Sequence, residues 1–366
     1  MIEDYLSQLF RTENSELARH LRHDLRGLCA SLKSALAESR GDPGAEVCEK
    51  LIDELKALFP PDTNSNRSND QPTNRLKLDP LRKAVLNDKI LSTRLGDLHL
   101  ISTEDSELWN ESQRLLLRVS EPLAEEWDQK ALKLAQKIGA EADESQVEEL
   151  PFSQDKLLYP GLTGTVEAKG LRLSTKAPLD KRVEGGKLDG DLKFLAQVVS
   201  ICLQFIEIDQ SLHHCLKNVF RFGVTPLDSK EKATYVKALI DRFRRVQKSE
   251  EKGEPEASLR ARLDLDEAIH SLVYLPPVET GSWWGNLQDA ARKTLEQAVD
   301  RVRQAGCPVT YKWLSGFYEN VNKYTKDDWA LENWGTPGEV SACLRVYARI
   351  DQEDLPGRVL FRPLRY

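Results

Sequence analysis

The sequence predicts a predominantly helical α+β protein. Leucines recur every three or four residues in several stretches, which is the spacing that places side chains on one face of a helix. Shorter stretches alternate apolar and polar residues between glycines and prolines, which is typical of strands. Of the 366 residues, 40% are hydrophobic and 30% are charged. A globular chain of this size and balance can bury a core without needing metals or disulfides.

Composition also narrows the classes of function. The net charge of −7 argues against a general nucleic-acid binder, because that role requires a basic face. The six cysteines include no CxxC pair, which favours a reducing compartment over a disulfide framework or a zinc site. The N-terminus has no signal-peptide pattern, and the most apolar stretch, residues 194–208, is too short to span a bilayer. We therefore expect a cytoplasmic protein without membrane segment, metal or cofactor.

Residues 1–59 are predicted to form a helical hairpin, with a turn at 41–44 (GDPG) and a second helix over 46–58. Two short helices can hardly bury a leucine stripe by themselves, so the stripe should pack against the rest of the chain, a second copy or a partner. One expectation that follows is a homo-oligomer formed through this hairpin. The candidate partner-binding residues on the first helix are Leu21, Leu25, Leu28 and Leu32.

Two polar stretches predict the domain boundaries. Residues 60–77 begin with sixteen positions that include no aliphatic or aromatic side chain, which predicts a flexible linker. Residues 249–258 (SEEKGEPEAS) are charged and are predicted to be a second, exposed linker. These stretches separate the hairpin, a mixed α+β domain over 78–248, and an aromatic-rich α+β domain over 259–366.

The middle domain is expected to mix helices with short strands. Pro122 is expected to interrupt a helical region, and Gly139 to end it. His213 and His214 are expected to be ordinary polar positions at a helix turn. The expected elements are a strand at 94–102, helix over 103–138, two short strands within 162–175, a turn-rich loop at 183–191, a buried helix over 192–208 and a helix over 228–248.

The last domain is expected to contain one long helix, which ends near Gly306, and a terminal pair of strands at 339–350 and 358–366. It holds five of the seven tryptophans. Large aromatic side chains build small cores, and tryptophan and tyrosine also dominate the binding energy of protein interfaces. We expect some of these rings to be buried and others to face a partner; the candidates are Trp283, Trp284, Trp313, Tyr318, Trp329 and Trp334.

The motif His23-Asp24-Leu25-Arg26 resembles the first four positions of the phosphoacceptor box of histidine kinases. In that family, an imidazole that faces solvent accepts the phosphoryl group while flanking leucines pack inside the bundle. Leu28 stands where the box has proline, and no glycine-rich ATP-binding half follows. We expect His23 to be a polar residue on the solvent face, and keep a His phosphoacceptor as an alternative.

The stretch GTVEAKG at 164–170 resembles the Glu-x-Lys strand of PD-(D/E)xK nucleases. That resemblance implies a metal held by Asp155 and Glu167, with Lys169 supporting the attacking water. Glu167 and Lys169 are two residues apart, so both would project from one face of a strand. Charged side chains on the solvent face of a hairpin explain the same pattern, and the acidic chain offers no obvious DNA-binding face.

The C-terminal segments PGEV (337–340), VYARI (346–350) and GRVLFRP (357–363) are similar in order to the end of GrpE-type exchange factors. That resemblance implies a small β domain after helices, and a protein that opens the nucleotide site of an Hsp70-type ATPase without catalytic residues of its own. The family's FDPxxHEA signature is missing, and Phe361 interrupts the RVLRP run.

Taken from the residues, the expected function is a non-enzymatic adaptor or regulatory subunit that binds a protein partner. No phosphate-binding glycine loop or nucleophile box stands out in the sequence. The alternatives are a GrpE-like exchange factor or cochaperone, a metal-dependent nuclease and a His phosphoacceptor protein.

Overall fold

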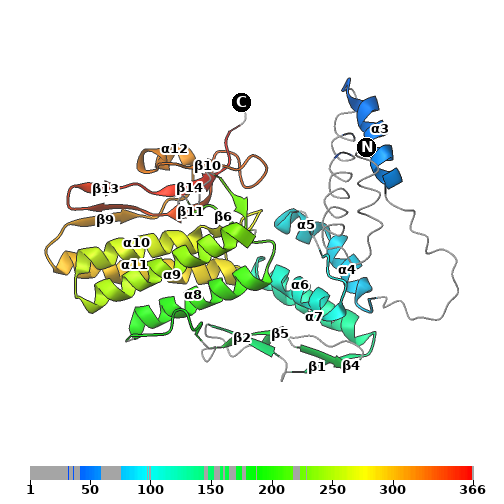
Figure 1. The fold of residues 1–366 in the computed structure, drawn as a ribbon, viewed down its shortest axis with the longest axis horizontal. Helices are drawn as coiled ribbons and strands as arrows, with labels where there is room; N and C mark the ends of the chain where they lie inside the picture. Colours follow the sequence, from blue (N-terminus) through cyan, green and yellow to red (C-terminus); the bar gives the residue numbers. More distant parts are fainter. Residues whose placement is uncertain are drawn as a thin grey trace. The chain divides into compact units, whose positions relative to one another are not determined.

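A computed structural model of the chain is mostly helical with small sheets, which confirms the predicted α+β class (Figure 1). The chain divides into two compact units, Met1–Thr73 and Asn74–Tyr366, which are described separately. The structure describes Leu32, Leu36 and residues 42–58, 76–96, 98, 100–143, 147–151, 157–159, 161–164, 170–174, 179–186, 188–216, 223–227 and 229–364.

In the first unit, helix α3 (Ala45–Leu58) confirms the predicted second helix of the hairpin. It begins after a turn in which the carboxylate of Asp42 accepts a hydrogen bond from the Gly44 amide, 2.6 Å away. The Cys48 thiol lies 3.9 Å from the carbonyl oxygen of Leu32, which is itself helical and half-buried. Leu21, Leu25, Leu28 and most of the predicted linker lie outside the described residues.

The second unit begins with helices α4 (Asp79–Leu86), α5 (Lys89–Leu95), α6 (Asp105–Leu116) and α7 (Glu121–Gln136). The prediction of helix interrupted near Pro122 is confirmed, because Pro122 occupies the first turn of α7, where its missing N–H costs nothing. Gly139, with φ +87°, follows the end of α7 as expected.

The predicted strand at 94–102 is wrong. Its first residues end helix α5, which the Asp88 carboxylate caps by accepting hydrogen bonds from the amides of Ile90 and Leu91 at 2.9 Å. Gly96, with φ +74°, stops the helix. A side chain at Gly96 would also clash, because its Cβ would lie 2.8 Å from both Pro276 and the Trp334 ring. The described residues beyond it form no regular element.

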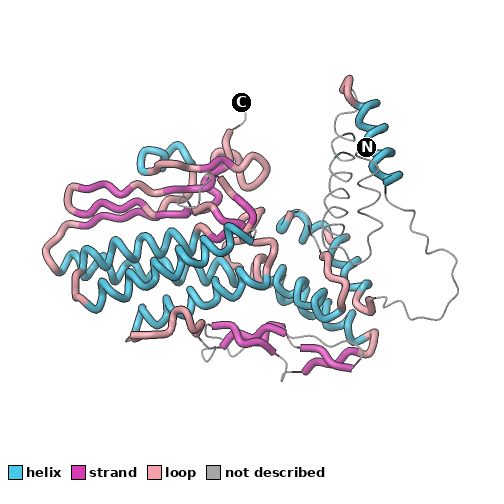
Figure 2. The backbone as a smooth tube through the Cα atoms, viewed as in Figure 1, coloured by secondary structure: helices cyan, strands magenta, loops and turns pink. Residues whose placement is uncertain are grey.

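Five short strands follow α7. Strands β1 (Ala140–Asp143) and β4 (Gly161–Gly164) pair antiparallel, and β5 (Gly170–Ser174) lies between the parallel β2 (Val147–Pro151) and the antiparallel β3 (Leu157–Tyr159). The expectation of two short strands within 162–175 is met by β4 and β5, with Gly170 opening the second. Figure 2 shows these strands as a separate layer beneath the helices.

A bundle of four long helices forms the body of this unit: α8 (Gly190–Ile208), α9 (Ser229–Glu251), α10 (Pro255–His270) and α11 (Trp283–Gln304). Helix α8 confirms the predicted buried helix, since eleven of its residues are buried. Helices α9 and α11 likewise confirm the helices predicted there. The expected linker at 249–258 contains the end of α9, a turn at Gly253 and the start of α10. Ser249 and Ser258 are buried there, because the two helices pack against one another.

His213 and His214 form strand β6, so the expected helix turn is wrong. Strand β6 pairs with β7 (Thr225–Pro226) on one side and with β8 (Leu272–Val273) on the other. These strands form because the ends of α8 and α10 bring segments together that are distant in the sequence. A local sequence pattern does not predict such strand pairs.

The C-terminal strands lie over α9 to α11 (Figure 1). One sheet has the order β10 (Trp329–Ala330), β14 (Arg358–Phe361) and β11 (Val340–Arg345), and the other has β13 (Glu353–Leu355), β12 (Tyr347–Ile350) and β9 (Val309–Lys312). The predicted terminal pair is confirmed by the antiparallel β11 and β14. The expected strand over 339–350 divides at Val346, because its two halves join different sheets. A short helix, α12 (Tyr318–Val321), precedes β10.

Candidate functional site

Helix α10 carries charged side chains into the space between the helices and the C-terminal sheets. Asp266 is 4% exposed and accepts hydrogen bonds from the Arg292 guanidinium of α11 at 3.0 to 3.2 Å. Its Oδ1 also lies 3.2 Å from Nδ1 of His270. Burial alone would raise the pKa of Asp266, but the charges of Arg292 and His270 outweigh it and bring this pKa to about 2. Asp266 is therefore a buried carboxylate that stays ionised.

The neighbouring Glu267 faces three arginines from three different elements. Its carboxylate lies 2.9 Å from Arg345 of β11, 3.4 Å from Arg358 of β14 and 3.6 Å from Arg242 of α9. The Arg358 guanidinium also donates to the Cys215 carbonyl oxygen at 2.6 Å. These contacts attach the C-terminal sheet to the helices through charge rather than through apolar packing alone.

A third group of ion pairs connects α10 with α8 and α9 through Arg262. Arg262, which is 2% exposed, lies 3.2 Å from Asp191 of α8 and 2.6 Å from Glu250 of α9. We call the whole set the α10 ion-pair network. It pairs five arginines with five carboxylates: Arg242, Arg262, Arg292, Arg345 and Arg358 with Asp191, Glu250, Asp264, Asp266 and Glu267. Arg245 and Arg301, which are more exposed, also pair with Asp264 and Glu250 at its edge.

The network reaches the surface under Trp313. The Trp313 ring lies over the Arg292 guanidinium, 5.2 Å from ring centre to Cζ, and the residue is 43% exposed. Trp313 directly follows strand β9. Trp313 therefore has one side of its ring against a buried arginine while much of the residue remains exposed.

A second exposed aromatic residue, Phe317, lies beside the start of β11. Gly338 adopts φ +82°, which turns the chain so that its carbonyl oxygen accepts the Tyr318 amide at 2.8 Å. Leu364 lies against the other side of Gly338, where a Cβ would meet its Cγ at 3.1 Å. Phe317 is 59% exposed and Leu364 is 47% exposed. The Tyr318 ring stacks on Phe361 at 3.7 Å in the same region.

The remaining predicted tryptophans occupy different environments. Trp329 of β10 is 40% exposed, and its ring covers Gly223. Trp334 is half-buried against Gly96. Trp284 is 1% exposed and contacts Phe205 at 5.2 Å between ring centres, so it belongs to the core and lies out of reach of a partner. Trp283 is half-buried beside the same phenylalanine.

We use the name aromatic surface for the exposed large side chains of residues 313–364, a set defined by exposure and by place in the sequence: Trp313, Phe317, Trp329 and Leu364. Sequence reasoning had proposed the two tryptophans. It missed Phe317 and Leu364, although Phe317 follows a turn glycine, Gly316, in the stretch WLSGFY. Gly316 indicates a turn from the sequence alone. Whether the Phe317 side chain is exposed depends on how this turn packs against the rest of the protein.

Among the described residues, His214 and the buried thiols of Cys202 and Cys215 offer little nucleophilic chemistry. The Nε2 of His214 lies 2.6 Å from the Glu231 carboxylate in a buried pair. Burial raises the pKa of the Cys202 and Cys215 thiols to about 12. Both therefore remain protonated at neutral pH, and a protonated thiol is a poor nucleophile.

The weak catalytic candidates Asp155, Glu167, Lys169 and His23 lie outside the described residues. In the part of the chain that is described, no group of three histidine, cysteine or acidic side chains is arranged to hold a metal ion. No helix of that part combines the length and the apolar character needed to cross a membrane.

The segments that resemble GrpE-type factors lie at the start of β11 (PGEV), in β12 (VYARI) and in β14 (GRVLFRP). Comparison with models of known families, with curated proteins and with solved structures finds no match for this chain.

Proposed function

We propose that this protein is a cytoplasmic adaptor or regulatory subunit that binds a protein partner through the aromatic surface. The observation that carries the proposal is the exposure of three large aromatic side chains, Trp313, Phe317 and Trp329, in one C-terminal region. Aromatic anchors supply most of the binding energy in protein interfaces, because they bury a large area at a small cost in side-chain entropy.

The scaffold beneath these side chains supports the same proposal. Trp313 rests on Arg292, which Asp266 holds by three hydrogen-bond contacts. Phe317 follows a backbone turn fixed by hydrogen bonds to Gly338 and from Val340. Anchors that are already ordered before binding lose less entropy when a partner docks, so affinity rises.

Affinity capture tests the proposal. The tagged full-length protein and the variant Trp313→Ala/Phe317→Ala/Trp329→Ala are used to capture partners from the native host, with a tag-only sample as background and quantification by mass spectrometry. A matched control is Ile90→Ala/Ile101→Ala, since these side chains are 58% and 55% exposed elsewhere in the same unit. We expect a stoichiometric partner with the wild type and the control, reduced at least ~10-fold in the triple variant.

A partner captured equally by all three proteins contradicts the aromatic surface as the binding site. A chain that begins at Asn74 then shows whether the N-terminal hairpin binds instead, because residues 74–366 form a compact unit by themselves. Capture of an Hsp70-type ATPase supports the exchange-factor alternative, and accelerated nucleotide release from that ATPase is the measurement that decides it.

A further inference from the structure

Arg118 is a buried arginine outside the α10 ion-pair network. It follows the end of helix α6, and its carbonyl oxygen accepts the Glu279 amide at 3.1 Å. The preceding residue, Leu117, accepts the Trp284 amide at 3.1 Å. Two long-range backbone hydrogen bonds thus hold this position, and the Arg118 side chain is left 4% exposed.

The Arg118 guanidinium has no oxygen partner among the described residues. Its Nε is buried without a hydrogen-bond acceptor, and the group makes no ion pair in that part of the chain. Its Cζ lies over the ring of Tyr274, 4.4 Å from the ring centre. A buried cation that lacks a carboxylate partner carries a large desolvation cost, so an unpaired position of this kind is rare.

Asp209 is the acid whose charge acts on Arg118, and both of its carboxylate oxygens accept hydrogen bonds from other groups. The Oδ1 of Asp209 accepts from the Ser211 amide at 2.9 Å and from its hydroxyl at 2.6 Å, and Oδ2 accepts from the Tyr274 hydroxyl at 2.9 Å. Asp209 acts on Arg118 through space, without a direct hydrogen bond. The Arg118 guanidinium therefore keeps at least its Nε donor without an acceptor among the described residues.

A second arginine lies one helical turn earlier. Arg114 is half-buried in the last turn of α6, and its side chain, like that of Arg118, makes no hydrogen bond or ion pair to any described residue. Burial raises the pKa of Tyr274 well above its usual value, and the charges of Arg118 and Arg114 both act in the opposite direction. Arg114 and Arg118 are four residues apart at the end of α6, and the charges of both act on the Tyr274 hydroxyl.

The wall behind this pair is aromatic. The Tyr274 ring meets Trp284 edge-on at 5.5 Å, and Trp284 contacts Phe205 at 5.2 Å.

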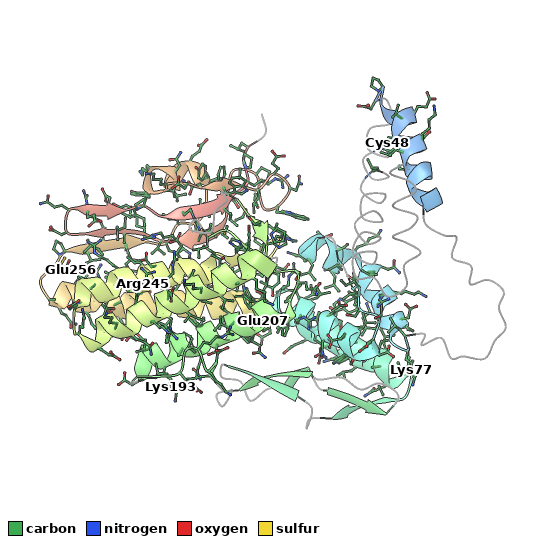
Figure 3. All side chains as sticks on the ribbon, viewed as in Figure 1. Cys48, Lys77, Lys193, Glu207, Arg245 and Glu256 are labelled. Atoms are coloured by element: carbon green, nitrogen blue, oxygen red, sulfur yellow. The ribbon has the colours of Figure 1, made fainter. Side chains whose placement is uncertain are left out.

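Glu207, labelled at the end of α8 in Figure 3, lies two residues before Asp209. Its carboxylate forms an ion pair with Lys232 at 2.5 Å. Charged groups interact more strongly beside such an apolar wall than in water.

We propose that Arg114 and Arg118 bind an oxyanion, a carboxylate or phosphate group of a ligand, beside Tyr274. Guanidinium donors in a planar fork match both groups, and the oxyanion supplies the hydrogen-bonded acceptor that the buried Arg118 lacks among the described residues. The site is distinct from the aromatic surface and does not depend on the function proposed for it.

His213 provides a direct readout. Its Nδ1 lies 2.9 Å from the Ser211 carbonyl oxygen. Burial lowers the pKa of His213, the charges of Arg118 and His214 lower it further, and the Ser211 hydrogen bond and Asp209 oppose them. An oxyanion bound to Arg118 would cancel part of the Arg118 charge, so the pKa of His213 should rise on binding.

The experiment follows the imidazole titration of His213 by NMR in the full-length protein. Inorganic phosphate and, separately, acetate are added at constant ionic strength set with sodium chloride, and the pKa of His213 is compared with its value in chloride alone. The variants are Arg118→Gln and Arg114→Gln. The matched control is Arg301→Gln, since Arg301 is 46% exposed and pairs with Glu250.

We expect the pKa of His213 to rise with at least one oxyanion in the wild type and in the control. The apparent affinity should fall about 10-fold or more in Arg118→Gln, as expected for loss of a charged hydrogen bond, and less in Arg114→Gln. A response to phosphate alone assigns a phosphoryl ligand, and a response to acetate alone assigns a carboxylate. No shift with either anion, or an unchanged affinity in both variants, overturns the proposal. If Arg118→Gln fails to fold, the result for Arg114→Gln decides between these outcomes.

Discussion

The α10 ion-pair network and the Arg114–Arg118 pair bury the same kind of side chain in opposite ways. In the network, Arg292 is 3% exposed and Asp266 accepts from it at 3.0 to 3.2 Å. Arg118 is buried to a similar extent, at 4% exposure, and faces a tyrosine ring instead of a carboxylate. The arginines of the network have carboxylates in direct contact, whereas Arg118 has no hydrogen-bonded carboxylate in the part of the chain that the structure describes.

The presence or absence of a paired carboxylate beside a buried arginine indicates where a ligand could bind. Burying a charge is expensive, so a charge that serves only the fold is accompanied by its counter-charge. The network follows this rule and so works as an internal clamp between the helices and the C-terminal sheet. The Arg114–Arg118 pair departs from it, and such departures are more informative about binding than a well-paired cluster.

The largest effect should come from breaking the network. Replacing Arg292 with methionine leaves Asp266 buried with only His270 beside it. We expect Arg292→Met to lower the free energy of unfolding by about 3–5 kcal/mol. Urea denaturation measures this against Arg301→Met, whose exposed side chain should cost below about 0.5 kcal/mol. Equal midpoints for the two variants would show that the clamp contributes nothing.

A somewhat smaller effect should follow from pH. The folded pKa of Asp266 is about 2, below its usual 3.8, so the stabilisation is fully present above about pH 4 and is lost as the pH falls toward 2. The shift corresponds to about 2 kcal/mol. Urea midpoints between pH 2 and 5 test this, with Asp266→Asn expected to show a flatter profile. Parallel profiles for the two proteins would assign the acid sensitivity to other carboxylates.

The unpaired arginine should respond differently from Arg292. Arg118→Met removes a buried charge on which Asp209 acts only through space, so no direct hydrogen bond is broken, and it keeps most of the side-chain volume. We expect the free energy of unfolding to stay within about 1 kcal/mol of wild type, because the loss of the Tyr274 contact offsets the relief of desolvation. A loss as large as that of Arg292→Met would mean that Arg118 is structural after all.

The smallest effect concerns the link between the network and the aromatic surface. Trp313→Leu removes the ring that lies over Arg292. At an exposed site, this interaction should contribute about 0.5 kcal/mol, so the urea midpoint should fall slightly. Phe317→Leu is the control, because Phe317 is even more exposed, and its midpoint should not change. A larger change for Phe317→Leu would indicate that the Gly338 turn depends on that ring.

Helices were the part of the fold that could be predicted most reliably from the sequence. The apolar spacing of α8 and α11 and the placement of Pro122 at the start of α7 are local patterns, and each has a local physical cause. The strand expected at 94–102 failed because an Asp88 cap and a left-handed Gly96 decide that stretch, and alternation alone does not reveal either.

The candidate sites were much less predictable. Trp313 and Trp329 could be proposed from composition, but nothing local separates them from the buried Trp284. Arg114 and Arg118 were not singled out at all, since arginines near the end of a helix normally complement its dipole. What makes Arg118 unusual is the position of Tyr274 and Asp209, which lie far away in the chain.

The sequence by itself thus determined the α+β class, the long helices and the presence of an aromatic-rich C-terminal region, because periodicity and composition act over short distances. Only the tertiary structure decided which tryptophans are exposed, how β6 pairs with β7 and β8, and which buried arginines have a carboxylate beside them. Burial and charge pairing depend on contacts between segments distant in sequence, and no local pattern encodes them.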